Sequence, residues 1–84
     1  MYKVTFSRSS YKQIKKLPIN DYIRIFNAIA ELINDPFKEI LDVKKLTDQE
    51  GYRVRIGNYR ILYTLNLKEK EVYVKSIAHR KDAY

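Results

Sequence analysis

The sequence contains no cysteine, and this absence excludes disulfide bonds, thiolate zinc sites and a cysteine nucleophile. A domain of this size without disulfide staples is typical of a reducing compartment. No apolar run approaches the roughly 18 residues that a membrane span needs, and the opening MYKVTFSRSS lacks the hydrophobic centre of a signal peptide. We therefore predict a cytoplasmic protein with no membrane contact.

The chain also has no internal repeat, no low-complexity run and too few residues for two domains. Its 84 residues, of which 45% are hydrophobic, predict a single folded domain over residues 1–84. A formal charge of +7 and a pI of about 9.7 favour a polyanionic partner. The charge is uneven, because nine Lys/Arg face seven Asp/Glu in residues 1–52, whereas eight face three in residues 53–84.

Hydrophobic periodicity predicts one strand and two helices in the N-terminal half. Residues 2–6 alternate apolar and polar side chains, as a half-buried strand does. The serines that follow can cap a short helix that ends before Pro18. A second helix, with an apolar stripe, is predicted from an Asn20 cap to Asn34. The short connection makes the two helices an antiparallel pair.

The second half of the chain predicts a long loop and then three strands. Residues 36–50 have apolar side chains but no clean period, which favours a loop. Alternation then marks three strands, at residues 52–56, 59–67 and 72–79. The resulting order β-α-α-β-β-β predicts an α+β fold in which the helix hairpin covers one face of a mainly antiparallel sheet.

The segment YRVRIGNYRILY carries the strongest functional signal. Its two-residue turn, Gly57-Asn58, predicts a type II′ hairpin. That turn pairs Arg55 with Arg60 and places Arg53 diagonal to Arg60. Because side chains alternate along a strand, all three arginines then share the face opposite the apolar residues.

An external anion explains this arginine cluster better than solvent alone. No Asp or Glu lies between Tyr52 and Leu67, so the hairpin supplies no counter-ion of its own. The planar, permanently charged guanidinium forks suit phosphate. The alternative is that the arginines extend into solvent while their stems cover apolar surface.

The C-terminal tail HRKDAY extends the basic cluster with His79, Arg80, Lys81 and Tyr84. If the second hairpin closes with a three-residue turn, Arg80 lies on the same face as Arg60. A two-residue turn sends Arg80 to the other face. The sequence leaves both registers open.

Cleavage of RNA by its own 2′-hydroxyl requires a base, an acid and stabilisation of negative charge on the phosphorane. Arginines provide the stabilisation, but a pKa above about 12 makes them poor bases. A mechanism with two histidines is excluded, because the chain has one histidine. The acid–base candidates near the cluster are His79, Tyr84, Glu71 and Asp82. The lack of a metal-binding carboxylate motif predicts a metal-independent reaction without a cofactor.

Taken together, these segments make the sequence resemble a known family. The Asp35-Pro36 pair, the VKKL segment, YRVRIGNYRILY and the closing HRKDAY together resemble the RelE family of toxins, within the RelE/ParE toxin–antitoxin superfamily. The resemblance covers essentially the whole chain and implies the compact RelE-like fold. It also implies a type II toxin that enters the ribosomal A site, cuts messenger RNA during translation and leaves a 2′,3′-cyclic phosphate.

The resemblance implies roles for seven residues. Four side chains would take part in catalysis: Arg60, Arg80, Tyr84 and His79. Three would bind RNA or its phosphates: Arg53, Arg55 and Lys81. The two catalytic arginines would hold the scissile phosphate, and the tyrosine would stack on or orient the attacked nucleotide. The histidine would supply acid–base capacity, because well-studied members have lysines where this chain has Arg53 and Arg55.

The resemblance also implies partners, and the residues leave other functions open. A cognate antitoxin would wrap around the toxin, and operator DNA would be bound only by that complex. A ParE-like member of the superfamily would instead inhibit DNA gyrase without being an enzyme. A plain RNA-binding module would use the basic residues and the eight tyrosines, although most tyrosines lie at core periods. An inactive toxin would act only in operator control.

Overall fold

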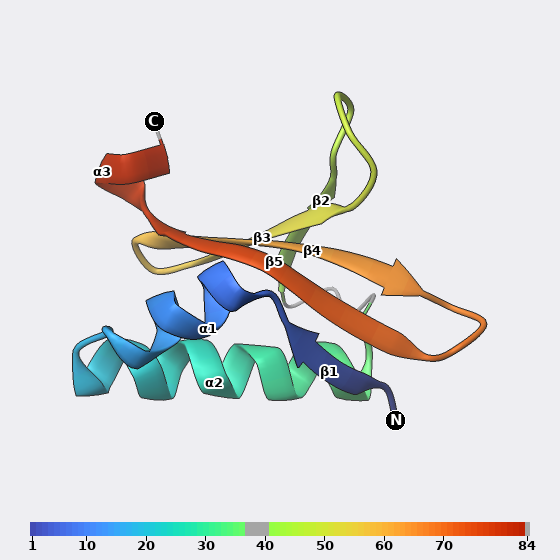
Figure 1. Ribbon diagram of the computed structural model, residues 1–84, viewed down its shortest axis with the longest axis horizontal. Helices are drawn as coiled ribbons and strands as arrows, with labels where there is room; N and C mark the ends of the chain where they lie inside the picture. The colour runs from blue at the N-terminus through green and yellow to red at the C-terminus, as the bar shows by residue number, and fades with distance from the viewer. Residues whose placement is uncertain (37–40, 84) are drawn as a thin grey trace.

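The computed structural model describes residues 1–36 and 41–83 of the chain. Its elements, in chain order, are β1 (Lys3–Phe6), α1 (Arg8–Lys15), α2 (Ile19–Asn34), β2 (Asp42–Lys45), β3 (Tyr52–Ile56), β4 (Tyr59–Asn66), β5 (Glu71–His79) and α3 (Arg80–Ala83). Helices α1 and α2 lie against the sheet, and α3 rises from the end of β5 on the side away from α2 (Figure 1). No helix in the described ranges has both the length and the apolar character that crossing a membrane requires.

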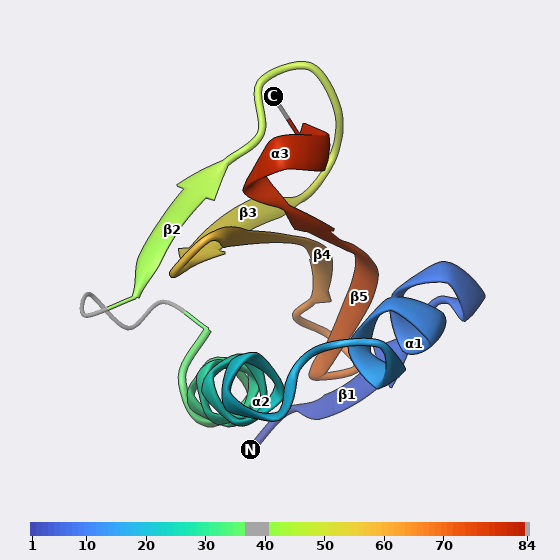
Figure 2. The same ribbon diagram turned by 90° about the vertical axis from the view of Figure 1, so that its left-hand side faces the viewer.

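The strands form one mixed sheet of five, in the order β1-β5-β4-β3-β2. β1 pairs in parallel with β5, while the β2–β3, β3–β4 and β4–β5 pairs are antiparallel. The sheet is strongly twisted, and α2 is seen nearly end-on beneath it in Figure 2. This arrangement confirms the predicted α+β fold, with a helix pair on a mainly antiparallel sheet.

The core lies between α2 and the sheet. Four buried side chains come from α2: Ile25, Ala28, Ile29 and Leu32. Seven come from the three central strands: Val54, Ile56, Ile61, Tyr63, Val72, Val74 and Ile77. Full burial of a large aliphatic side chain contributes about 1.5–3 kcal/mol, so the inward side of α2 is the main attachment of the helix pair to the sheet.

Serine hydroxyls fix α1 against β5. Ser7 is the N-cap of α1, and its Oγ accepts a hydrogen bond from the Ser10 backbone N–H at 3.0 Å. The Ser7 hydroxyl donates to the Lys75 carbonyl oxygen at 2.7 Å, and the buried Ser10 hydroxyl donates to the Val74 carbonyl oxygen at 2.9 Å. The predicted serine cap is confirmed, and it also anchors α1 to the middle of β5.

Two local predictions are wrong. Strand β2 occupies Asp42–Lys45 within the segment predicted as a loop, because pairing with β3 organises a stretch too short to show a period. Residues 37–40 of that predicted loop lie outside the described residues. Helix α2 begins at Ile19, with Pro18 at its N-cap and no side-chain cap bond. Proline's fixed φ suits a helix start, so Asn20 lies inside the helix and does not cap it.

Gly51, just before β3, is expected to tolerate no side chain. Its φ is +123°, and a β-carbon there would lie 2.8 Å from the backbone carbonyl oxygen of Tyr63. Gly51→Ala is therefore expected to lower the free energy of unfolding by at least about 1 kcal/mol, measured by urea denaturation. The exposed neighbour provides the control, because Glu50→Ala should change it by less than about 0.5 kcal/mol. Equal losses in the two variants would contradict this account of Gly51.

Candidate functional site

The β3–β4 hairpin has the predicted register. Gly57 opens the turn with a φ of +59°, while Asn58 keeps a negative φ, as a type II′ turn requires. Arg55 stands directly opposite Arg60 on the neighbouring strand. Arg53, two residues before Arg55, points to the same side by alternation. The prediction that the three arginines share one face of the sheet is confirmed.

The turn between β4 and β5 does not by itself place Arg80 beside Arg60. The pairing of Asn66 with Glu71 starts a register that, if unchanged, would put Arg60 opposite Ile77. Arg80, three residues beyond Ile77, would then lie on the other face of the sheet, because three steps along a strand reverse the side. The turn, residues 67–70, has four residues and is thus neither of the two predicted turns, but its register sends Arg80 to the same face as a two-residue turn would.

A β-bulge corrects that register. The pairing shifts by one residue between Leu62 and Tyr63, where Lys75 is the extra residue of β5. Arg60 consequently pairs with Ala78. Ala78 therefore lies on the Arg60 face, and Arg80, the first residue of α3, lines the same pocket as Arg60.

These arginines line a pocket of about 500 Å³, formed by Arg55, Gly57, Asn58, Tyr59, Arg60 and Arg80. The Arg80 backbone N–H donates to the Asn58 carbonyl oxygen at 2.6 Å, which ties the start of α3 to the hairpin turn. The turn and α3 lie at the same end of the sheet (Figure 1). Among the residues that the structure describes, no lining side chain is acidic, so the pocket concentrates positive charge in a space that suits a nucleotide phosphate.

A fourth arginine reaches the edge of this pocket from α2. The Arg24 Nη1 atom lies 2.7 Å from the position that a β-carbon on Gly57 would occupy, so the guanidinium packs over the bare backbone of the turn. Gly57 thus provides both the positive φ of the turn and room for this contact. Sequence reasoning missed Arg24, because no local pattern links a helix residue to a turn more than thirty residues away.

Three predicted site residues that the structure describes are absent from the pocket lining: Arg53, Lys81 and His79. Arg53 is 7% exposed, and its Nη1 atom has no hydrogen-bond partner among the described residues. Lys81 is exposed on α3, directly after Arg80. Tyr84 lies outside the described residues, so its place near the phosphate remains a prediction.

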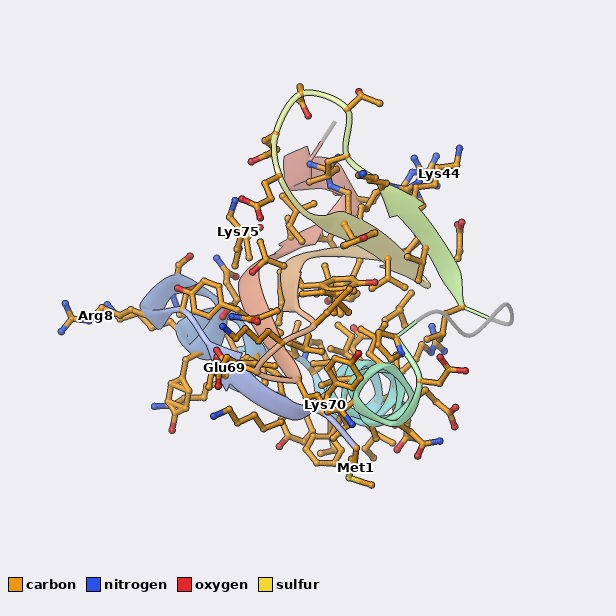
Figure 3. The ribbon with its side chains drawn as sticks, turned by 90° about the vertical axis from the view of Figure 1, so that its right-hand side faces the viewer. Met1, Arg8, Lys44, Glu69, Lys70 and Lys75 are labelled. Carbon is orange, nitrogen blue, oxygen red and sulfur yellow. The ribbon has the colours of Figure 1, made fainter. Side chains whose placement is uncertain are left out.

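Strand β2 changes the charge balance expected for the hairpin. Asp42 stands opposite Arg55, so the cluster faces a carboxylate that residues 52–67 do not contain. Lys44 stands opposite Arg53 and adds a positive charge on the same strand (Figure 3). The surroundings of the pocket therefore remain positive. In the part of the chain that the structure describes, no three His, Cys, Asp or Glu side chains gather as a metal site requires.

His79 lies on the opposite side of the sheet from Arg60. It pairs with Tyr59 across β4 and β5, and the two rings meet edge to face, with centroids 5.1 Å apart and planes at 88°. Its Nδ1 atom accepts a hydrogen bond from the Lys81 backbone N–H at 3.1 Å. The structure thus places His79 at the start of α3 and does not bring it into the pocket lining with Arg80.

Tyr59 connects the pocket to α2. Its hydroxyl donates to the Asp21 Oδ2 atom at 3.0 Å. Burial, then this hydrogen bond, then the negative charge of Asp21 raise the pKa of Tyr59 above its ordinary value. Tyr59 therefore stays protonated near neutral pH and cannot act as a base in the pocket.

Helix α1 and its C-cap form a second basic surface. Its exposed cations are Arg8, Lys12, Lys15 and Lys16, and no Asp or Glu lies in residues 8–20. Arg8 extends outward from the start of the helix, away from the rest of the molecule (Figure 3). The small net charge of residues 1–52 does not reveal this cluster, because acidic residues elsewhere in that part of the chain offset its positive charge. A polyanion therefore meets positive charge outside the pocket as well.

Known proteins are similar to this chain in both sequence and fold. Residues 4–84 match the family described as the ParE toxin of the type II toxin–antitoxin system parDE. RelE1 of Methanocaldococcus jannaschii is 31% identical over 99% of this chain and 94% of its own length. A chain of the RelE–RelB complex of Pyrococcus horikoshii OT3 matches with a TM-score of 0.83 and 30% identity, over 98% of both chains. A chain of the RelB–RelE complex of Methanococcus jannaschii matches with a TM-score of 0.78 and 31% identity, over 94% of this chain and 93% of its own. The chain belongs to the RelE/ParE family of toxins of type II toxin–antitoxin systems.

Proposed function

We propose that this toxin is an endoribonuclease that cuts messenger RNA in the ribosomal A site. The observation that supports the proposal is the pocket lined by Arg55, Arg60 and Arg80, with no acidic side chain among the described residues of its lining. A guanidinium fork binds two phosphate oxygens through parallel hydrogen bonds, and it keeps its charge at any cellular pH. A protein with this activity works in the cytoplasm, where ribosomes translate.

The reaction uses a nucleophile that the RNA itself carries. The 2′-oxygen bonds to the adjacent phosphorus and loses its proton, the bond from phosphorus to the 5′-oxygen breaks, and the 5′-oxygen takes up a proton. The products are a 2′,3′-cyclic phosphate and a free 5′-hydroxyl. Negative charge grows on the phosphorane oxygens in the transition state, and Arg60 and Arg80 stabilise it there. We expect no metal ion or cofactor in this reaction.

The other basic residues have roles that follow from their exposure. Arg55 and Lys81 are exposed, so the RNA backbone beside the scissile phosphate can reach them. Arg53 is buried, so it adds its charge to the potential of the cluster without touching RNA. Tyr84 stacks on or orients the attacked nucleotide, as the family resemblance implies.

Translation of a defined message with purified ribosomes tests the proposal. The wild-type protein is expected to cut the message at specific codons only while ribosomes translate it, and primer extension maps the cuts. The same message without ribosomes is the control. An intact message at a toxin concentration that stops translation would overturn the ribonuclease proposal.

The family description favours a second candidate function, because it names the ParE toxin. A ParE-like protein would bind DNA gyrase and inhibit supercoiling without cutting RNA. A supercoiling assay with purified gyrase separates the two candidates. Inhibited supercoiling with an intact message would support gyrase as the target, and cut message with normal supercoiling would support the ribonuclease. Binding of RNA with neither effect would indicate a plain RNA-binding module.

We also propose that a cognate antitoxin covers the outer side of α2. Ile19, Ile23 and Phe26 are exposed there, and Phe26 stacks on Tyr22 with ring centroids 6.0 Å apart. The solved relatives from Pyrococcus and Methanococcus are complexes of RelE with RelB. The charge of +7 favours an acidic, amphipathic segment as the partner. Operator DNA would be bound only by the complex of toxin and antitoxin.

Replacing Ile23 and Phe26 together by serine is expected to weaken antitoxin binding at least about tenfold, because both side chains would be buried in the complex. The fold should not change, since both side chains are exposed in the free toxin. Isothermal titration with the purified antitoxin measures the difference. Leu67→Ser, at an exposed leucine in the β4–β5 turn, is the matched control. The same loss in the control would contradict docking on α2.

A further inference from the structure

His79 acts as the N-cap of α3. It is the last residue of β5 and directly precedes the helix that begins at Arg80. Its Nδ1 atom accepts a hydrogen bond from the Lys81 backbone N–H at 3.1 Å, which is the bond that an N-cap side chain makes to the first turn. An imidazole that accepts at Nδ1 carries its proton on Nε2 and is neutral.

One further contact holds this imidazole in place, and a second contact holds the residue that makes it. The Tyr59 ring packs against it edge to face, at a centroid distance of 5.1 Å. The Tyr59 hydroxyl is in turn bound to the Asp21 Oδ2 atom at 3.0 Å. This line of contacts connects α2 through β4 to the junction of β5 and α3. The imidazole orientation is therefore set by the packed body of the domain and not by the tail alone.

The backbone around Arg80 is fixed on both sides. The Arg80 N–H donates to the Asn58 carbonyl oxygen at 2.6 Å, and the next N–H, that of Lys81, is bound by His79. Between these two anchors the Arg80 side chain lines the pocket. The direction of the guanidinium thus depends on a helix start that the histidine holds.

We propose that His79 is a positioning residue, which caps α3 and thereby aims Arg80 into the arginine pocket, with Tyr59 and Asp21 holding it in that role. The inference rests on the proposed function of the pocket as a phosphate site. It differs from an acid–base role, because His79 is absent from the pocket lining and its Nδ1 lone pair is already used by the helix. Misplacement of a reacting group by about 1 Å can cost on the order of a hundredfold in rate, so such a role is measurable.

Two substitutions at His79 separate the positioning role from proton transfer. Asparagine is a strong N-cap residue and places its oxygen where the imidazole has Nδ1, whereas glutamine places its oxygen nearer to the Nε2 position. We expect His79→Asn to cut message within about threefold of wild type, and His79→Gln to lose at least about tenfold, mainly in kcat. Both variants should melt at similar temperatures. Equal activity of the two variants, high or low, would overturn the proposal.

A double-mutant cycle with inorganic phosphate as the probe tests the link to Arg80. His79→Ala is expected to weaken phosphate binding in the wild-type background, as measured by NMR titration of the free protein. It should cause no further weakening in the Arg80→Ala background, because a residue that acts through Arg80 has nothing left to position. Equal weakening in both backgrounds would overturn the proposal.

The same experiments separate this inference from the proposed function. If wild-type protein binds phosphate but cuts no message, the ribonuclease proposal fails, and the cycle still decides the role of His79. If wild-type protein binds no phosphate, the pocket is not a phosphate site and the inference about His79 fails.

Discussion

Arg60→Ala is expected to reduce ribosome-dependent message cleavage at least about tenfold, and Arg80→Ala to do the same, because both side chains line the pocket and each would, in the proposed reaction, donate hydrogen bonds to the phosphorane of the transition state. The turns of the two hairpins do not by themselves bring Arg60 and Arg80 together. The bulge in β5 shifts the pairing by one residue and so places Ala78 opposite Arg60, two residues before Arg80. The two variants should keep the fold, because Arg60 is half-buried and Arg80 is exposed at a helix start. Single-round cleavage with purified ribosomes measures the loss.

Two further variants make this experiment specific for the pocket. Lys68→Ala also removes one positive charge, from the exposed β4–β5 turn, and should leave cleavage within about twofold, because an exposed distant charge is screened by salt. Arg60→Lys keeps the charge but loses the planar fork, so an intermediate loss is expected. Near-normal cutting by both Arg60→Ala and Arg80→Ala would defeat the assignment of the pocket to the scissile phosphate.

The β3–β4 hairpin is predictable from the sequence because a two-residue turn leaves one register. Glycine at the first turn position accepts the φ of +59° that the turn imposes, and every pairing back to Tyr52 follows by counting. Arg55 and Arg60 are therefore placed opposite each other by local sequence alone. The same holds for the serine cap of α1, where Ser7 bonds within its own first turn.

The position of Arg80 is not predictable in this way. The bulge at Lys75 leaves its carbonyl oxygen to a partner outside the sheet, and the hydroxyl of Ser7 provides that partner at 2.7 Å across 68 positions of the chain. Nothing in the VYVKSIAH segment marks the extra residue. The place of Arg80 in the pocket therefore goes with a bulge whose extra residue is bonded by a distant part of the chain.

Tertiary pairing also explains what the sequence does not reveal about β2 and Arg24. Of the four residues in β2, Val43 alone is half-buried, so no alternation distinguishes this edge strand from a loop. Its Asp42 meets Arg55 only because the strand pairs with β3. Arg24 meets Gly57 only because α2 packs under the hairpin. A count of charges within residues 52–67 therefore misses the carboxylate that β2 places opposite the hairpin arginines.

Leu32→Ala is expected to give the largest loss of stability among the variants considered, about 2–5 kcal/mol in the free energy of unfolding. Leu32 is 0% exposed and belongs to the row of α2 side chains that faces the sheet, so alanine would leave a cavity between the two layers. The free energy of unfolding of a small domain is about 5–15 kcal/mol in total, so this loss would leave much of the protein unfolded at physiological temperature. Urea denaturation followed by circular dichroism measures it.

Ile23→Ala is the matched control, because Ile23 lies on the same helix and is 50% exposed. Its expected change is below about 0.5 kcal/mol, since the better helix propensity of alanine offsets the small loss of burial. An equal loss of stability in Leu32→Ala and Ile23→Ala would mean that the side of α2 that carries Leu32 is not the one packed on the sheet. If the outer side of α2 binds the antitoxin, the two variants should also respond differently to it. If the antitoxin binds the folded toxin alone, it should restore Leu32→Ala to the folded state, whereas Ile23→Ala should stay folded and bind more weakly.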